Sequence, residues 1–151
     1  MRQNASHPDR LQRRSDVHPD LAEIAAGLAG ETIAVTADLS DPSWVAELDA
    51  AAEGLDVGLV VANAGLSRAG RFVDEDTDFR HLTIAVNATA AADLVAWGCR
   101  RFAARGGGGV ITMSSGSALA GTGGFATYSA TKAFLVNHTE AVGWEMRDQG
   151  V

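Results

Sequence analysis

The spacing of apolar residues switches repeatedly along the chain between a strand-like and a helical pattern. Short uninterrupted apolar runs predict three buried strands, at residues 32–36, 57–62 and 110–113. Apolar positions at helical spacing predict helices at residues 40–54 and 77–105, and a last helix is expected at about 125–148. Because strands alternate with helices and each strand is a continuous apolar run, the sequence predicts an α/β fold built on a doubly wound parallel sheet.

The beginning of the chain has a different character. Residues 1–18 are polar and have no usable hydrophobic period, so we expect a disordered leader followed by one domain at 19–151. Leu21 and Leu28 lie among apolar residues at helical spacing, and the helix they predict should end at Gly30, since glycine tolerates positive φ there.

Capping and glycine-rich segments mark further boundaries. Ser40 is the predicted N-cap of the helix at 40–54. Gly106 to Gly109 precede a strand, so we expect a flexible connector there rather than a phosphate-binding turn. Residues 121–126 match the letters G-x-G-x-x-A of a dinucleotide fingerprint, but they do not directly follow a strand. We interpret them as a loop over the substrate.

Composition narrows the function classes. The 151 residues are 46% apolar and carry a formal net charge of −7, which fits one globular domain and argues against nucleic acid or a membrane as a partner. No uninterrupted run approaches the roughly 18 apolar residues of a membrane span. The single cysteine, Cys99, excludes an internal disulfide and a cysteine-based zinc site, so we expect a cytoplasmic protein. His81 and His138 lack neighbouring ligands, so no metal site is expected.

The only tyrosine and the only lysine of the chain, Tyr128 and Lys132, are four residues apart. On a helix this spacing places both side chains on one face. An ammonium group beside a phenol favours the ionised phenol, which would suit Tyr128 to general acid catalysis. Taken alone, the pair could equally be an exposed polar contact on a helix.

Other polar residues follow the predicted strands, where the ligand crevice of a doubly wound sheet lies. Ser115 comes directly after the strand at 110–113, and its hydroxyl could hold a substrate oxygen on which charge develops. Residues 63–65 (Asn-Ala-Gly) follow the strand at 57–62, and Asn87 interrupts the apolar face of the long helix. Each of these signals is weak alone.

Together, these motifs resemble the short-chain dehydrogenase/reductase family over about residues 30–151. The matching segments lie in family order and near family spacing: Ala-Asp-Leu (37–39), Ala-Asn-Ala-Gly (62–65), Val-Asn (86–87), Ser-Ser (114–115) and Tyr-Ser-Ala-Thr-Lys (128–132). Family members are oxidoreductases that move hydride between a nicotinamide cofactor and a carbonyl or alcohol. The resemblance therefore implies a carbonyl or alcohol substrate of small size and NAD or NADP as cofactor.

The resemblance also assigns roles to catalytic residues. It implies that Tyr128 is the acid/base and that Lys132 favours its ionised form. Ser115 would orient the substrate carbonyl, and Asn87 would hold a water that links Lys132 to solvent.

Cofactor contacts follow from the same resemblance. Asp38 and Leu39 would flank the adenine, and Asn63, Ala64 and Gly65 would line the cofactor cleft. Tyr128 and Lys132 would also contact the cofactor at the nicotinamide ribose. The outer faces of the long helices would form the interface of a homodimer or tetramer.

The chain departs from the family pattern at both ends. Family members begin with a strand, a Gly-x-x-x-Gly-x-Gly turn, a helix and a second strand before the equivalent of residues 20–38. We therefore expect a truncated, partial Rossmann-like sheet of about three strands, with two exposed edges and without the first strands and the glycine-rich turn. Two hypotheses remain open. The chain is either an NAD(P)-dependent oxidoreductase core or a non-enzymatic remnant, inactive alone and at most a helix-mediated dimerisation module.

Overall fold

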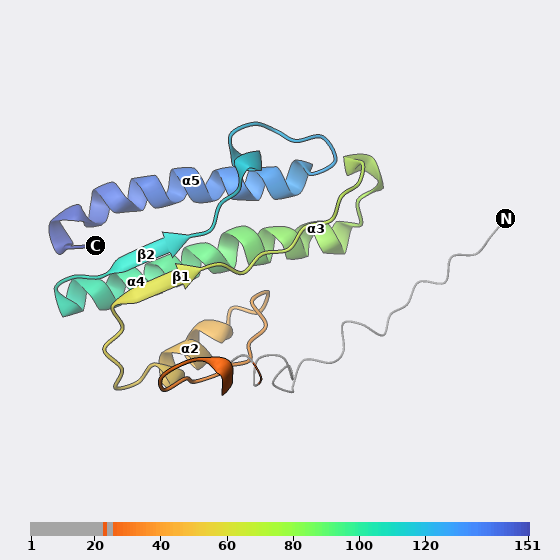
Figure 1. Cartoon of the computed structure of the whole chain (residues 1–151). Coiled ribbons are helices and arrows are strands. Elements are labelled where there is room, and N and C mark those ends of the chain that lie inside the picture. Colours follow the sequence, from red (N-terminus) through yellow and green to blue (C-terminus); the bar gives the residue numbers. More distant parts are fainter. Residues whose placement is uncertain (1–22, 24–25) are drawn as a thin grey trace.

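The structure is a computed structural model that describes residue 23 and residues 26–151 (Figure 1). The predicted leader at 1–18, and most of the first predicted helix, lie outside the described residues. Gly30 has a positive φ of 108°, as its place after that helix predicts. The elements along the rest of the chain are α2 (Trp44–Ala51), β1 (Leu59–Ala62), η2 (Phe72–Asp74), α3 (Thr77–Ile84), η3 (Ala85–Ala90), α4 (Ala91–Arg105), β2 (Gly109–Thr112), η4 (Gly116–Ala118), α5 (Ala126–Met146) and η5 (Arg147–Gln149).

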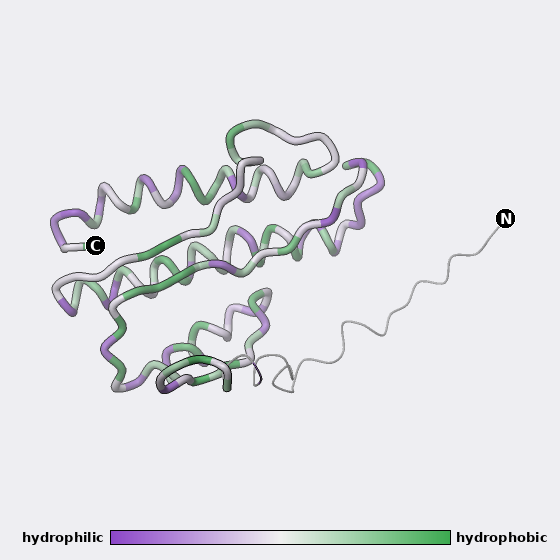
Figure 2. The backbone as a smooth tube through the Cα atoms, in the orientation of Figure 1, coloured by the Kyte–Doolittle hydropathy of each residue, from purple (hydrophilic) through white to green (hydrophobic). Residues whose placement is uncertain are grey.

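A parallel pair of strands forms the sheet of the described residues. β1 pairs with β2 in a register that runs from Leu59 opposite Gly109 to Ala62 opposite Thr112. The long helix between them, α3–η3–α4, makes the crossover that a parallel pair requires, and α4 packs against both strands. Figure 2 shows the hydrophobic residues concentrated along the two strands. This is the α/β arrangement predicted from the sequence.

The core lies between the sheet and the long helices. Its larger cluster joins Val60 of β1 to Trp97 and Phe102 of α4, and Phe102 is completely buried. A smaller cluster joins Ala62 to Leu135 of α5, which is 1% exposed. Both long helices therefore contribute apolar residues to this core.

The predicted strand at residues 32–36 is absent, so the expectation of about three strands is wrong for the described residues. Ile33 and Val35 instead line an apolar groove of about 350 Å³ together with Leu59 and Val61 of β1. This groove separates the segment from the edge of β1, and no ladder of backbone hydrogen bonds forms across it. The apolar run reflects contact with the groove, whereas a strand also requires a hydrogen-bonded neighbour.

The prediction of Ser40 as a helix N-cap is also wrong. The backbone N–H and the hydroxyl of Ser40 both donate to Asp38 Oδ1, at 2.9 and 2.8 Å. This local turn uses the side chain that was expected to cap the helix. Helix α2 begins later, at Trp44, and its N-cap residue Ser43 makes no side-chain capping bond.

The continuous helix at Thr77–Arg105 matches the predicted boundaries. Asp76 caps its beginning by accepting a hydrogen bond from the Phe79 N–H at 2.9 Å. The helix is long and apolar enough, by length and mean hydropathy, to span a membrane, although it contains no uninterrupted apolar run of that length. Half of its most apolar stretch is buried inside the fold, which is typical of a core helix.

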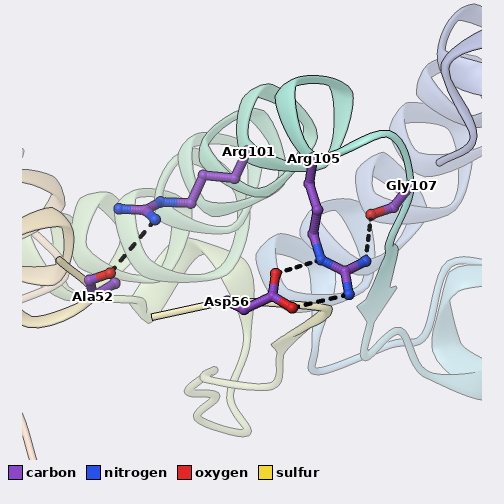
Figure 3. A network of polar contacts seen from close by, with 5 residues as sticks. All are labelled: Ala52, Asp56, Arg101, Arg105 and Gly107. Atoms are coloured by element: carbon purple, nitrogen blue, oxygen red, sulfur yellow. Dashed lines mark hydrogen bonds and ion pairs between the residues drawn. The ribbon is translucent and has the colours of Figure 1, made fainter. Parts of the chain in front are cut away.

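Two arginines attach α4 to the segment before β1 (Figure 3). The Arg105 guanidinium bonds the Asp56 carboxylate, with Nε 2.5 Å from Oδ1, and also donates to the Gly107 carbonyl at 2.9 Å. One turn earlier, Arg101 donates to the Ala52 carbonyl at 3.5 Å. The hydrogen bond from Arg105 lowers the pKa of Asp56 below its usual value. This network fixes the connection between α2 and β1.

A second carboxylate joins α2 to α4. Asp49 accepts a hydrogen bond from Trp97 Nε1 and another from Arg101, each at 3.0 Å. These bonds, first that of Trp97 and then that of Arg101, lower the pKa of Asp49. Trp97 is itself buried, so its indole N–H obtains a partner that the core alone would not supply.

The glycine segment before β2 is packed rather than being only a flexible connector, which corrects the prediction. Gly106 ends α4 in the left-handed region with φ 87°. A Cβ atom added to Gly108 would overlap the ring of Phe102. The absence of a side chain at Gly108 is therefore what allows the chain to turn across the buried ring.

We expect Gly108→Ala to lower the free energy of unfolding by roughly 1–3 kcal/mol, because the new methyl group must displace a fully buried ring. Gly143→Ala is the matched control, since Gly143 lies within α5 with nothing within 4 Å of an added Cβ. There alanine should be neutral or stabilising by up to about 1 kcal/mol. Urea denaturation measures both, and equal stability of the two variants would contradict the packing argument.

Candidate active site

The polar motifs of the sequence gather beyond the carboxyl ends of the two strands. Residues 63–65 follow β1, and Ser114 and Ser115 follow β2. Tyr128 and Lys132 lie in the first half of α5, whose helical geometry gives them the predicted common face. Parallel strands end at the same edge of a sheet, so these segments converge there.

Lys132 is a buried cation, with 5% of its surface exposed. Its Nζ donates to the Met113 carbonyl at 2.6 Å, directly after β2, and lies 5.8 Å from the centre of the Tyr128 ring. The Ser114 hydroxyl donates to the Lys132 carbonyl at 2.9 Å. These two bonds attach α5 to the end of β2 and fix the lysine beside the tyrosine.

Asn87 lies where the long helix widens into the π-helical segment η3, and its side chain is completely buried. Its Nδ2 donates to the Leu66 carbonyl at 2.9 Å, and its Oδ1 accepts from the Leu66 N–H at 2.8 Å. The side-chain amide of Asn87 therefore holds the loop after β1 by bonding both the N–H and the carbonyl of Leu66. π-helical turns are frequent at functional sites, and here the turn contains the asparagine.

Gly65 brings this loop against the lysine. A Cβ added to Gly65 would lie 3.4 Å from both Asn87 Oδ1 and Lys132 Nζ. The structure thus places Gly65, Asn87 and Lys132 side by side, although they come from three different elements.

Thr131 is a site residue that the sequence analysis did not single out. It is 4% exposed, and its hydroxyl accepts a hydrogen bond from Asn87 Nδ2 at 3.2 Å and donates to the Tyr128 carbonyl at 2.7 Å. It therefore links the loop after β1, through Asn87, to the turn of α5 that contains Tyr128. A threonine three residues after the tyrosine was the available signal, because a hydroxyl at that position can bond back to the helix.

Ser115 and Tyr128 are not hydrogen-bonded to each other in the described part of the chain. The Ser115 hydroxyl accepts from the N–H and the hydroxyl of Ser117, at 3.3 and 3.1 Å. The Tyr128 ring makes an edge contact with Phe125, with ring centres 6.3 Å apart. That the two hydroxyls act on one substrate oxygen therefore stays a prediction.

The residues expected around the cofactor fall into two groups. Leu39, Asn63 and Ala64 line a cavity of about 120 Å³ between the end of β1 and the long helix. Asp38 does not line it, and its exposed carboxylate holds Ser40. Gly65 faces the lysine instead.

A second cavity, of about 140 Å³, lies on the other side of the site and includes Tyr128 in its wall. The loops on its two sides are joined by a backbone bond from Gly70 N–H to the Gly124 carbonyl at 3.0 Å. The Thr127 hydroxyl, in the first turn of α5, donates to Glu75 at 2.8 Å and adds a second connection. Residues 121–125 thus form a loop beside the tyrosine, and the interpretation of this segment as a substrate loop stays a prediction.

Comparison with protein families gives one family model over nearly the whole chain. It is described as short chain dehydrogenase and matches residues 11–151. Among curated proteins, a 7β-hydroxysteroid dehydrogenase from Collinsella aerofaciens is 34% identical over 129 residues, which are 85% of this chain and 49% of that protein. The chain thus spans about half the length of the curated relatives it matches.

Solved structures give the same likeness in three dimensions. An alcohol dehydrogenase from Comamonas testosteroni, specific for bulky-bulky ketones, matches with a TM-score of 0.77 and 26% identity, over 86% of this chain and 53% of that one. A short-chain dehydrogenase from Sphingobium yanoikuyae, solved in complex with NADPH, matches with a TM-score of 0.76 and 27% identity, over 85% and 51%.

Replacing Thr131 tests the link that it makes. We expect Thr131→Val to lower the free energy of unfolding by about 1–3 kcal/mol, because it leaves a buried amide donor of Asn87 without a partner. Thr131→Ser keeps the hydroxyl and loses one methyl group, at a cost of about 0.8 kcal/mol. Thermal and urea denaturation compare the two. A valine variant as stable as the serine variant would show that the link contributes nothing.

Proposed function

Because this chain belongs to the short-chain dehydrogenase family, we propose that it carries the active-site residues of an NAD(P)-dependent oxidoreductase that interconverts a carbonyl and an alcohol. The observation that supports this most is the buried ammonium of Lys132 beside the Tyr128 ring, at the carboxyl end of a parallel sheet. The family match favours this function over a non-enzymatic remnant.

Tyr128 is the proposed acid/base. In the reducing direction its hydroxyl gives a proton to the substrate oxygen, and in the oxidising direction the phenolate accepts one. Lys132 Nζ is held 5.8 Å from the centre of the Tyr128 ring, which places a positive charge beside the proposed acid/base. Because Lys132 is held by the Met113 carbonyl, this charge stays in place while the proton moves.

Ser115 and Asn87 have supporting roles in the proposal. Ser115 donates to the substrate oxygen and orients the carbonyl toward Tyr128. Asn87 holds a water between Lys132 and solvent. Both amide hydrogens of Asn87 are already donated, to Leu66 and Thr131, so the water must bond the free lone pair of Oδ1 or the backbone of the π-helical turn.

The residues present fit a nicotinamide cofactor. Gly65 leaves the space beside Lys132 and Asn87 free of a side chain, and the cavity at Leu39, Asn63 and Ala64 lies at the sheet edge where dinucleotides bind in doubly wound folds. We propose that this cavity and Asp38 take the adenine half of NAD or NADP, with Tyr128 and Lys132 at the nicotinamide ribose. When bound, the cofactor gives or accepts the hydride. We also propose a cytoplasmic location, consistent with the one buried, unpaired cysteine.

Tyr128→Phe tests the proposed function. In the native protein, carbonyl reduction with NADH or NADPH should fall by about 10²–10⁴-fold, because the proton donor is lost. Cofactor binding, measured by fluorescence titration, should be nearly unchanged, because the ring and Lys132 remain. Equal loss of turnover and of cofactor binding would indicate a structural role for the tyrosine and contradict the proposal.

We further propose that the protein is a homo-oligomer assembled through α3 and α5. These helices enclose an apolar hollow of about 450 Å³ whose wall includes three partly exposed apolar residues, Phe72, Ile84 and Phe134. Exposed apolar patches of this kind are typical of interfaces.

Phe134→Glu should convert the oligomer to a monomer, because it places a carboxylate in the apolar contact. Leu119→Glu is the matched control, since Leu119 is 86% exposed and does not line the hollow. Sedimentation velocity distinguishes the species. A wild-type protein that is monomeric at high concentration, or an oligomer that survives Phe134→Glu, would contradict the proposed interface.

A further inference from the structure

We propose that Arg68 makes the site selective for oxo acids, that is, carbonyl substrates that also carry a carboxylate. The proposal rests on the proposed function, and it names the substrate class of the same site. The carboxylate would bond the Arg68 guanidinium while the carbonyl lies at Tyr128.

The geometry begins with one cavity that contains both residues. Arg68 lies in the loop after β1, and Tyr128 lies in the first turn of α5, yet both line the cavity of about 140 Å³. The Gly70–Gly124 backbone bond closes the loops around it. A molecule in this cavity therefore meets the tyrosine and the arginine together.

Arg68 is positioned by an aromatic ring rather than by a carboxylate. Its guanidinium carbon lies 4.0 Å above the centre of the Phe79 ring, at the beginning of α3. In the described part of the chain it makes no ion pair or hydrogen bond. A cation over a ring face is held without using its N–H groups as donors to an acceptor atom, so those of Arg68 stay available to a ligand.

The acidic residues of the same cavity already have partners. Asp74 pairs with Arg71 at 3.7 Å, Glu75 accepts the Thr127 hydroxyl at 2.8 Å, and Asp76 caps α3. Among the described residues of this wall, Arg68 is thus the arginine that has no ion pair with a carboxylate. A guanidinium binds a carboxylate by two parallel hydrogen bonds, which gives both affinity and orientation.

The test is a binding measurement that does not require hydride transfer. The probes are 4-oxopentanoate, its methyl ester and the (4-oxopentyl)trimethylammonium ion, which share the ketone and differ in charge. Each probe is titrated into the native protein, and its binding is measured by calorimetry and by ligand-observed NMR. We expect the acid to bind about tenfold or more tightly than the ester, as a charge-assisted hydrogen bond provides.

Arg68→Gln should remove this preference, so that acid and ester bind alike. Arg71→Gln is the matched control, because it makes the same change in net charge in the same loop but removes an arginine that is already paired with Asp74. It should keep the preference. Phe79→Leu should weaken the preference in part, because the guanidinium loses the ring that positions it.

Several outcomes would overturn the inference. The first is equal affinity for acid and ester in the wild type. The second is tightest binding of the cation, which would assign the cavity to Asp74, Glu75 and Asp76. The third is an equal effect of the two arginine variants on affinity, which would indicate only a dependence on net charge. Turnover separates this from the proposed function. Reduction of the neutral ester at equal rates by wild type and Arg68→Gln, without preference for the acid, rejects the inference alone. Absence of any carbonyl reduction rejects the proposed function.

Discussion

The burial of one ammonium group is the constraint on which the arrangement of this site depends. A charge taken out of water needs compensating oxygen atoms, and Lys132 finds the carbonyl of Met113 at the point where β2 ends. That requirement fixes the register of α5 against the sheet. The Ser114 hydroxyl reinforces this register by donating to the Lys132 carbonyl. Once α5 is fixed, its helical geometry sets the position of Tyr128 relative to the lysine, and none of the described residues bonds the tyrosine hydroxyl.

A second polar arrangement attaches the loop after β1 to this helix. Asn87 bonds the backbone of Leu66, and Thr131 continues the connection to the Tyr128 carbonyl. Each bond is buried or partly buried, so a missing partner would be costly and each bond favours one geometry. Three segments that are far apart in the sequence thereby become one rigid site. This is the preorganisation that positioning a substrate and a proton donor requires.

Local sequence predicted much of this structure because helix spacing and strand runs are local properties. The helix at Thr77–Arg105 follows from apolar periodicity, and the helical geometry of Ala126–Met146 places Tyr128 and Lys132 on the predicted common face. The segment at 32–36 shows the limit, because β-branched residues favour a strand that forms only beside a partner strand. The π-helical turn at Asn87 and the bond from Asn87 to Thr131 depend on tertiary contacts, which no local pattern contains. The sequence did not predict the contact of Arg68 with the Phe79 ring for the same reason, since the two residues lie eleven positions apart.

The site divides into two parts with different physical constraints. The lysine, the asparagine and the threonine are buried and bonded on several sides, so a change at any of them disturbs the fold itself. Much of the cavity wall beyond Tyr128 comes from the exposed loop at 67–76, which is held by a backbone bond at Gly70 and by the side chain of Thr127 in α5. Side chains in that wall, including Arg68, can therefore differ without moving the proton donor. A division of this kind allows one catalytic arrangement to serve different substrates, because specificity and chemistry are supported by separate sets of contacts.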